Sequence, residues 1–587
     1  MSDYGRRRAG RRTLTEASRS RRSGRLELTW TNKDWRLLAR EDGTWDWVPP
    51  SDYRIAEVRL LHEAATVGDA YEEPESLLIR GDALNALTAL NEIPDYAECF
   101  AGGVQLAYLD PPFNTQQSFL QYDDALEHSL WLTMLRDRLE QVQKLLDPDG
   151  SVWVHLDDSE VHRCRLLLDE VFGADCFVGT VIWEKADSPR MDAKHFSTRH
   201  DYLLVYGVEP DPDIHGLTYE PEHYDQVDAE GRSYYLKPLR AMAGEASTRE
   251  ARPNLYFSLN APDDTEIWPK LPDGRDGRWR WSQERVERDR DLIEWKHARR
   301  GWQPYYRIYA RDEATRPPET IWLSTDVGSN RTSKAEVKRL LPDMPPFATP
   351  KPEALLARVI EIASRRGDLV LDCFVGSGTT AAVAHKLGRR WIAVERSVEV
   401  VDQYALPRLT QVVRGEDRGG VTPTAGWEGG GGFRVLQVGP SMFNDDEGQI
   451  VLADWAVNGA LAEATAAQLH FPYRPESPFS GRRGRTRLAV IDGHVSQAVV
   501  QLLLDQLEGR ELLVVCGTSL DPLAGEELRQ ARPGSRARKI PDSLLAEYQK
   551  THRWRPGSVE VLRSGEGTVV PAAAAEHAQA APEKVPN

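Results

Sequence analysis

A glycine turn between a predicted strand and a predicted helix constrains the fold of this chain more than any other feature. Residues 369–373 read Leu-Val-Leu-Asp-Cys, an apolar run typical of a strand buried inside a parallel sheet. A GxGxxA turn follows at Gly376 and Gly378 and leads into a helix through residues 385–387. The glycines let the backbone turn sharply and lie close to a ligand, and the helix N-terminus offers unpaired N–H groups. The pattern indicates an α/β fold with a nucleoside-cofactor site.

An acidic residue lies where such a site binds a ribose. The next predicted strand, residues 391–394, ends in Glu395. Glu395 follows Gly376 by about 20 residues, the spacing of the acidic ribose ligand in dinucleotide-binding units. Dehydrogenases and methyltransferases share this arrangement, so a nicotinamide oxidoreductase stays open at this point. A glycine turn that only packs a helix against a strand is the structural alternative.

A second motif, Asp-Pro-Pro-Phe, closes the predicted strand 104–109. An exocyclic amino nitrogen is a poor nucleophile because its lone pair is delocalised into the base. The Asp110 carboxylate and the Pro111 carbonyl can accept its two N–H bonds, and Pro111 and Pro112 hold that carbonyl in place. Phe113 can stack on a base that has been rotated out of a duplex. The motif therefore predicts methyl transfer to an amino group, whereas four residues in isolation also suit an ordinary strand-ending turn.

The order of the two motifs gives the chain a family resemblance. It resembles the β-class DNA amino-methyltransferases, most closely the modification subunits of type III restriction–modification systems, in which a DPPF-like motif precedes the cofactor glycines. The resemblance covers roughly residues 26–432. Local matches support it: RGDAL at 80–84, DPPFNT at 110–115, HDYLLVY at 200–206 and ATPKP at 348–352. Position 113 departs from the usual Tyr, which keeps the stacking face and loses a hydroxyl.

The resemblance implies the cofactor, the target and the site residues. The cofactor is S-adenosylmethionine, and the target is adenine N6 in double-stranded DNA, because Asp110 is typical of adenine enzymes and Ser is commoner among cytosine-N4 enzymes. A cytosine-N4 methyltransferase and a catalytically silent DNA-specificity subunit are the alternatives. The residues with implied cofactor roles are Asp82, Lys351, Asp372, Phe374, Gly376, Gly378, Thr379 and Glu395.

Several reaction classes lack their sequence signatures. Cytosine-C5 methylation needs a cysteine nucleophile, typically after proline, and none of the five cysteines follows one. There is no GxxxxGK[ST] loop, no nuclease cluster and no spacing that suggests a metal site. The sparse cysteines favour a reducing compartment, so we expect a cytoplasmic protein. No apolar run approaches the roughly 18 residues that cross a bilayer, so no membrane association is expected.

The charge distribution bears on DNA as a partner. The formal net charge of −17 weakens a nucleic-acid interpretation, but affinity for phosphates depends on local basic patches. One such patch is the Arg-rich start of the chain, residues 1–25, and another is the stretch 275–311, where tryptophans and tyrosines alternate with arginines. Those aromatic side chains suit base stacking, or they form the small core of an inserted domain with solvated arginines around it.

The expected architecture has several units, because 587 residues are too many for one ordinary domain. It is a Rossmann-like methyltransferase domain with an inserted target recognition region and a smaller C-terminal α/β unit. The C-terminal unit shows no catalytic residues. By the resemblance it forms a homodimer or docks a restriction subunit, and a purely structural role is equally open. The expected segments are a basic arm and Trp-rich extension (1–75), a first methyltransferase part (76–207), the recognition region (208–320), a second methyltransferase part (321–428), the C-terminal unit (433–545) and a mostly disordered tail (546–587).

Overall fold

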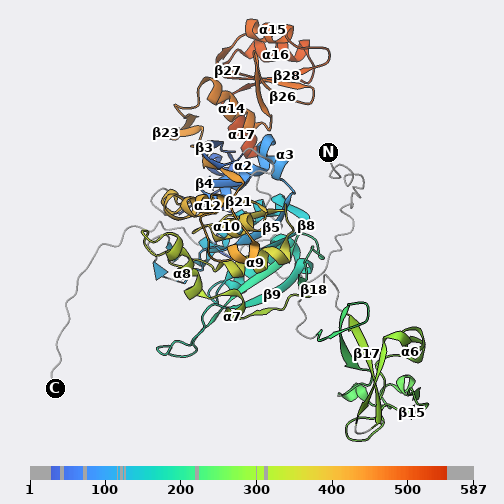
Figure 1. Ribbon diagram of the computed structural model, residues 1–587. Helices are drawn as coiled ribbons and strands as arrows, with labels where there is room; N and C mark the ends of the chain where they lie inside the picture. The colour runs from blue at the N-terminus through green and yellow to red at the C-terminus, as the bar shows by residue number, and fades with distance from the viewer. Residues whose placement is uncertain are drawn as a thin grey trace, which may run out of the picture.

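The computed structural model has a central body and two outlying units (Figure 1). The inserted unit around β17 and α6 lies at the lower right, and the C-terminal unit around α15 and α16 lies at the top. The predicted basic arm and most of the predicted tail lie outside the described residues. The structure describes residues 28–39, 45–70, 76–115, 117–118, 123–124, 127–218, 224–242, 244–298, 301–309 and 315–551.

A ten-stranded sheet forms the body, in the order β19-β9-β10-β8-β5-β20-β21-β4-β22-β3. From β8 to β22 the neighbouring strands run parallel, whereas β10 and β3 run antiparallel to their neighbours. The carboxyl ends of the parallel strands therefore meet at one edge. The strands are β3 (Leu61–Gly68), β4 (Leu77–Arg80), β5 (Val104–Leu109), β8 (Leu146–Leu156), β9 (Phe177–Glu184), β10 (His200–Gly207), β19 (Ile321–Trp322), β20 (Leu369–Asp372), β21 (Arg390–Glu395) and β22 (Gly432–Val438).

Helices cover both faces of this sheet. Leu77 and Ile79 of β4 face one apolar cluster and Leu78 faces the other, as alternation along a strand requires. The first cluster takes side chains from α2 (Ala83–Glu92), α3 (Pro94–Phe100), α4 (His128–Leu145) and α5 (Val161–Leu168). The second takes them from α7 (Ser324–Val327), α9 (Glu353–Ala363), α10 (Thr379–Lys386) and α12 (Leu406–Val413). The body is thus the predicted Rossmann-like α/β fold.

The predicted boundary between the body and a unit that begins at residue 433 is wrong. The glycine run 429–432 leads into β22, which pairs in parallel with β4 and antiparallel with β3. Phe433, Val435 and Leu436 are fully buried, so the strand belongs to the core of the body. Strand β3 likewise draws part of the predicted N-terminal extension, residues 1–75, into the same sheet. Both strands escaped prediction because their partners are hundreds of residues away.

The inserted unit has a sheet and a small core of its own. Its strands lie in the order β12 (Gln226–Val227), β13 (Ser233–Pro238), β17 (Gly301–Tyr309) and β16 (Ile293–Ala298). Trp279 and Trp281 are 1% and 4% exposed and pack with Leu239 and Val286, so these two tryptophans are core residues and not base-stacking platforms. Strands β11 (Leu217–Thr218) and β18 (Thr315–Arg316) pair where the unit leaves the body. Helix α6 (Gln283–Arg288) and the hairpin β14 (Leu259–Asn260) and β15 (Glu266–Ile267) complete it.

The C-terminal unit is built on a five-stranded sheet, in the order β25 to β29. Leu544 and Tyr548 of α17 pack in its core together with Val58 and Leu60, so the predicted boundary at residue 545 falls inside a helix that runs to residue 551. Among the described helices, none is long and apolar enough to span a membrane. The elements are β25 (Tyr473–Glu476), β26 (Phe479–Arg483), β27 (Thr486–Val495), β28 (Leu512–Leu520), β29 (Arg536–Lys539), α14 (Asn458–Gln468), α15 (Gln497–Asp505), α16 (Pro522–Ala531) and α17 (Asp542–Thr551).

Short elements complete the chain around these three parts. The N-terminal hairpin packs against α4, and Phe443 of β23 and Val337 of α8 lie in buried apolar clusters. They are β1 (Arg36–Ala39), β2 (Trp45–Val48), α1 (Tyr53–Ala56), β6 (Gln117–Ser118), β7 (Asp123–Asp124), α8 (Asn330–Leu340), α11 (Val398–Val400), α13 (Thr422–Ala425), β23 (Phe443–Asp446) and β24 (Gln449–Leu452).

Candidate functional site

The carboxyl ends of four adjacent parallel strands bring the two sequence motifs together. Strand β5 ends before Asp110, and its neighbour β20 ends at Asp372. Strand β21 ends at Glu395 next to β20, and β4 lies on its other side, before Asp82. The Gly81 N–H donates to the Glu395 carbonyl at 2.9 Å, which ties these last two ends together. Ligands of open α/β sheets bind at this kind of edge.

The glycine turn has the backbone geometry that only glycine adopts readily. Gly376 and Gly378 have φ of 49° and 82°, and Gly378 is the N-cap of α10. A Cβ on Gly378 would lie 3.2 Å from the Ala405 Cα. The Gly376 N–H donates to Glu395 Oε2 at 3.0 Å, and the Ser397 N–H donates to Oε1 at 3.0 Å. These two bonds hold the glutamate against the turn, and burial raises the pKa of its carboxyl.

Asp372 and Phe374 flank the entrance to the turn. The Asp372 carboxylate is buried and accepts the Phe374 N–H at 2.9 Å. Burial raises the pKa of Asp372 to about 7, although hydrogen bonds from Thr380 and from the Phe374 backbone act in the opposite direction. The half-buried Phe374 ring packs against the first apolar cluster.

Two residues with implied cofactor roles have their side chains engaged elsewhere. The Thr379 hydroxyl is buried and accepts a hydrogen bond from Arg408 Nη1 at 2.8 Å. The Asp82 carboxylate caps α2 through the Leu84 N–H at 2.8 Å and pairs with Arg138 Nη2 at 2.7 Å. Both contacts hold parts of the fold together, so these two side chains have a structural role in addition to any contact with a ligand.

Lys351 contacts the DPPF motif. Its ammonium donates to Asp110 Oδ2 at 2.5 Å and lies 5.0 Å from the centroid of the Phe113 ring. Lys351 is 8% exposed. The other carboxylate oxygen, Asp110 Oδ1, is buried and has no hydrogen-bond partner among the described residues. A carboxylate with one oxygen held and the other buried and open is placed to accept a donor from a ligand.

The prolines fix the rest of the motif. The Pro112 carbonyl accepts the indole N–H of Trp131 at 2.7 Å, and Pro111 is buried. Asn114 has φ of 61°, and its amide donates to Glu160 Oε1 at 2.7 Å. Both ends of the turn are therefore tied to helices of the body, which keeps the Pro111 carbonyl and the Phe113 ring in fixed positions.

A buried histidine forms the wall beside Phe113. The centroid of the His155 ring lies 5.7 Å from that of Phe113 and 5.4 Å from that of Trp183. The Tyr108 hydroxyl hydrogen-bonds His155 Nδ1 at 2.7 Å, and Asp201 Oδ2 lies 3.5 Å from Nε2. Burial, together with the nearby Lys351 charge, lowers the pKa of His155. This shift favours the neutral ring, which packs as part of the wall of the site.

Sequence reasoning missed the histidine of this wall. A single histidine in the strand 151–156 carries no motif and resembles any core residue. The only related signal was the match at 200–206, which contains Asp201 and Tyr202. Similarly, the match at 348–352 indicated Lys351, but it did not indicate that Lys351 lies on Asp110.

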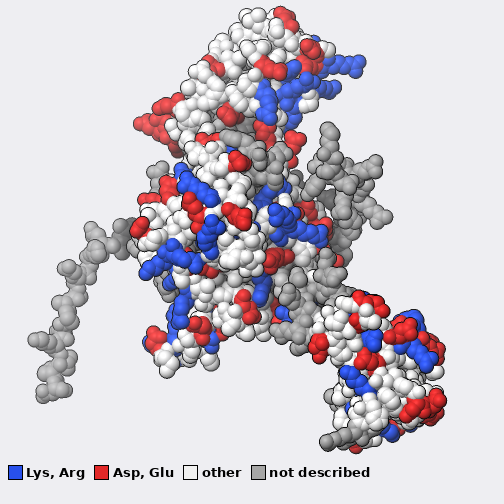
Figure 2. All heavy atoms as spheres, in the orientation of Figure 1, with Lys and Arg blue, Asp and Glu red and all other residues white. Residues whose placement is uncertain are grey.

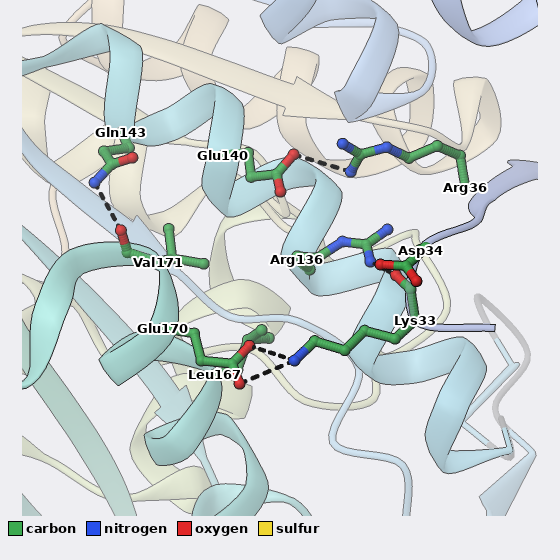
Figure 3. Close-up of a pocket in the computed structure, with 9 residues that line it drawn as sticks. All are labelled: Lys33, Asp34, Arg36, Arg136, Glu140, Gln143, Leu167, Glu170 and Val171. Atoms are coloured by element: carbon green, nitrogen blue, oxygen red, sulfur yellow. Dashed lines mark hydrogen bonds and ion pairs between the residues drawn. The ribbon is translucent and has the colours of Figure 1, made fainter. Parts of the chain in front are cut away.

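A cavity of about 430 Å³ lies away from these residues (Figure 3). It opens between the N-terminal segment and α4, and none of the predicted site residues lines it. Several of its charges are paired, for example Lys33 with Glu170 at 3.0 Å and Arg36 with Glu140 at 2.9 Å. We interpret it as the seam where residues 33–36 dock on the body.

Comparison with known proteins places this site in a family. The chain is 28% identical over 438 residues to the HindVI Mod subunit of Haemophilus influenzae, covering 65% of this chain and 56% of that protein. It is 28% identical over 421 residues to the EcoPI Mod subunit, a type III restriction-modification enzyme of Escherichia phage P1, covering 61% and 60%. With the type II methyltransferase M.KpnI of Klebsiella pneumoniae the identity is 26% over 302 residues, covering 48% and 71%. The chain therefore spans less than two thirds of the length of both Mod subunits.

Solved structures give weaker matches. The cytosine-N4-specific PvuII DNA methyltransferase is 16% identical with a TM-score of 0.31, covering 57% of this chain and 86% of that chain. M1.HpyAVI, solved as a complex with S-adenosylmethionine, is 15% identical with a TM-score of 0.27, covering 57% and 99%. The family model described as DNA methylase, in contrast, matches residues 104–406, more than half of the chain and the span that holds both motifs. The chain belongs to the N6/N4 DNA methylase family.

Proposed function

We propose that this protein transfers a methyl group from S-adenosylmethionine to adenine N6 in double-stranded DNA, as the modification component of a restriction–modification or phage-defence system. The observation that carries the proposal is the Asp110 carboxylate. Asp110 directly follows β5, the neighbour of the strand that leads into the glycine turn. Its Oδ1 is buried without a hydrogen-bond partner among the described residues, and Lys351 binds its other oxygen. Similarity to Mod subunits supports the assignment to restriction–modification.

The residues at the sheet edge fit the cofactor. Gly376 and Gly378 have no Cβ to obstruct a ligand, and α10 begins at this point with its free N–H groups. The Glu395 carboxylate is oriented by two backbone N–H bonds and retains acceptor capacity for ribose hydroxyls. Asp372 and Phe374 complete the edge. When bound, S-adenosylmethionine supplies an electrophilic methyl group on its sulfonium sulfur.

The chain's own residues prepare the amino group. Asp110 Oδ1 accepts one N–H of the base, and the Pro111 carbonyl accepts the other, which localises the nitrogen lone pair. Lys351 holds Oδ2 and so keeps Oδ1 directed at the amino group. Phe113 stacks on the base, and the apolar wall of His155 and Trp183 excludes water. The nitrogen gains the methyl group as the methyl–sulfur bond breaks, with that bond's electron pair left on sulfur, and the nitrogen releases one proton toward Asp110 Oδ1.

DNA binding is assigned to the inserted unit and its surroundings, residues 208–320. Its most exposed arginines include Arg275 and Arg288, whose side chains are 72% and 71% exposed. Each pairs with an aspartate in this structure, and Figure 2 shows basic and acidic side chains interspersed over the unit. Contact with phosphates would replace these exposed ion pairs, which cost little to break. The proposal also includes that the protein forms a homodimer, binds a restriction subunit and acts in the cytoplasm.

Mass spectrometry of nucleosides from plasmid DNA, incubated with the protein and S-adenosylmethionine, tests the function. N6-methyladenine is the expected product. N4-methylcytosine would refute the assigned base. Protein that binds both the cofactor and DNA but leaves the DNA unmethylated would favour a silent specificity subunit.

A single substitution tests the chemistry. Asp110→Ala should lower the rate by about 100-fold or more with little change in cofactor affinity. Asp95→Ala, at an exposed aspartate on α3, is the control and should retain activity.

A further inference from the structure

The loop between β9 and β10 is held together by hydrogen bonds across its base and carries two exposed apolar side chains. Figure 1 shows it as a teal segment that projects from the body at lower left. Ala186 and Arg199 bond to each other at its base, and the Arg190 N–H donates to Ser197 Oγ at 2.6 Å nearer the tip. These bonds leave residues 191–196 as the tip.

The tip begins and ends with a large apolar residue. Met191 is 94% exposed and Phe196 is 93% exposed, more than any other large apolar side chain in the described part of the chain. Leu502 comes next, at 67%. Leaving two such side chains in water forgoes the hydrophobic stabilisation of burial, so their exposure indicates a surface that a ligand covers. Arg190 and Lys194 lie beside them, in a chain of net charge −17.

The base of the loop is continuous with the candidate site. The loop leaves β9 at Glu184 and enters β10 at His200, and β10 pairs with the carboxyl end of β8. Lys185, the first residue of the loop, donates to Asp201 at 2.6 Å. Asp201 lies 3.5 Å from His155, whose ring faces Phe113. A duplex presented to Phe113 therefore lies on the side of the body from which the loop projects.

We propose that the tip of this loop, residues 191–196, enters the DNA duplex beside the target base. Phe196 and Met191 act as an apolar wedge that occupies the stack when the base rotates toward Phe113, and Arg190 and Lys194 contact the flanking phosphates. Phe and Met are among the side chains that proteins insert between base steps, at the cost of partly unstacking them. This inference rests on the proposed function, which requires the target base to leave the duplex.

The test compares two duplexes built around the site that the wild-type protein methylates, as mapped by sequencing. In one duplex the target base is paired, and in the other it lies opposite an abasic site, where extrusion is already cheap. The variants are Phe196→Ala, Met191→Ala and the double substitution. Leu502→Ala, at an exposed leucine of the C-terminal unit, is the matched control. A 2-aminopurine at the target position reports unstacking by its fluorescence.

The double variant should lose about tenfold in kcat/KM on the paired duplex and retain wild-type kcat/KM opposite the abasic site. Its 2-aminopurine signal should fall on the paired duplex, whereas Leu502→Ala should match the wild type on both. An equal loss on both duplexes would overturn the wedge in favour of simple DNA contact. No loss would overturn it in favour of a protein-docking tip. Failure of the wild type to methylate any DNA would refute the proposed function itself, a different result from either.

Discussion

The ion pair between Lys351 and Asp110 indicates that Lys351 orients the catalytic carboxylate and does not only bind the cofactor. The sequence places Lys351 among the cofactor ligands, but the structure places its ammonium 2.5 Å from Asp110 Oδ2. Lys351→Met should lower the methylation rate by about 100-fold, because Asp110 loses the contact that directs Oδ1 at the amino group. Its dissociation constant for S-adenosylmethionine, measured by calorimetry, should change much less.

The conservative variant provides the control. Lys351→Arg keeps the charge and should recover part of the rate. A rise in the cofactor dissociation constant as large as the fall in rate would show that Lys351 acts on the cofactor instead.

The buried Asp372 carboxyl makes stability depend on pH. Burial raises its folded-state pKa from 3.8 to about 7. The stabilisation that its proton provides is therefore complete below about pH 4 and is lost as the pH rises through about 7. Asp372→Asn stays neutral, so its Tm relative to the wild type should rise between these pH values and then level off. Thermal melts across this range measure the difference, and a difference independent of pH would contradict the assignment.

Among the helices and strands, the start of α10 depends on Gly378. Its φ of 82° and the 3.2 Å approach of the Ala405 Cα leave little room for a side chain. Gly378→Ala should lower the free energy of unfolding by about 1–3 kcal/mol, because it forces a strained backbone against Ala405, the residue before α12. It should also weaken cofactor binding, which a fluorescence titration measures. Gly274→Ala, at φ of 90° with open space around it, controls for backbone strain alone.

A buried charge network lies at the other end of α10, which ends at Lys386. Lys386 of α10 is fully buried and binds both oxygens of Glu353, at 2.9 and 2.8 Å, and Asp417 at 2.5 Å. Lys386→Met leaves Asp417 buried without its Lys386 partner and Glu353 paired with Arg408 alone, and it should lower the free energy of unfolding by about 3–5 kcal/mol. Arg474→Met, which breaks an exposed pair with Asp95, should cost less than about 1 kcal/mol in the same urea titration. Equal effects would argue against the burial of the network.

Local patterns predicted the two motifs that the structure brings to one edge of the sheet, whereas contacts between residues far apart in the sequence could not be predicted. The strand before Gly376 and the turn after β5 are contiguous in sequence, so their residue types indicate both geometry and chemistry. The contact of Lys351 with Asp110 spans 241 residues and leaves no local trace. Strand β22 begins at the last of four consecutive glycines, which resemble a linker, and its place in the sheet depends on β4 and β3. His155 is a lone strand residue whose surroundings come from three other strands.

For the protein as a whole, the inserted unit is attached through one short strand pair. Leu217 faces Arg316 and Thr218 faces Thr315 across β11 and β18, so the body is closed where the insertion leaves it. Replacing residues 219–314 with an Asn-Gly turn should leave a folded body that binds S-adenosylmethionine with wild-type affinity. Site-specific methylation, measured by sequencing of modified DNA, should be lost. Methylation of the wild-type sites by this variant would place recognition elsewhere.

The pairing of β3 with β22 has a consequence for biosynthesis. Leu61 and Val438 are register partners, so the first strand of the ten-stranded sheet to leave the ribosome waits for the last strand of that sheet. At about 5–20 residues per second, translation of the intervening chain takes tens of seconds. Throughout that time β3 has no partner, and one edge of β4 is exposed with unpaired N–H and C=O groups. Ribosomes that stall before residue 432 therefore release chains with an open sheet edge, and these chains should depend on chaperones to stay out of aggregates.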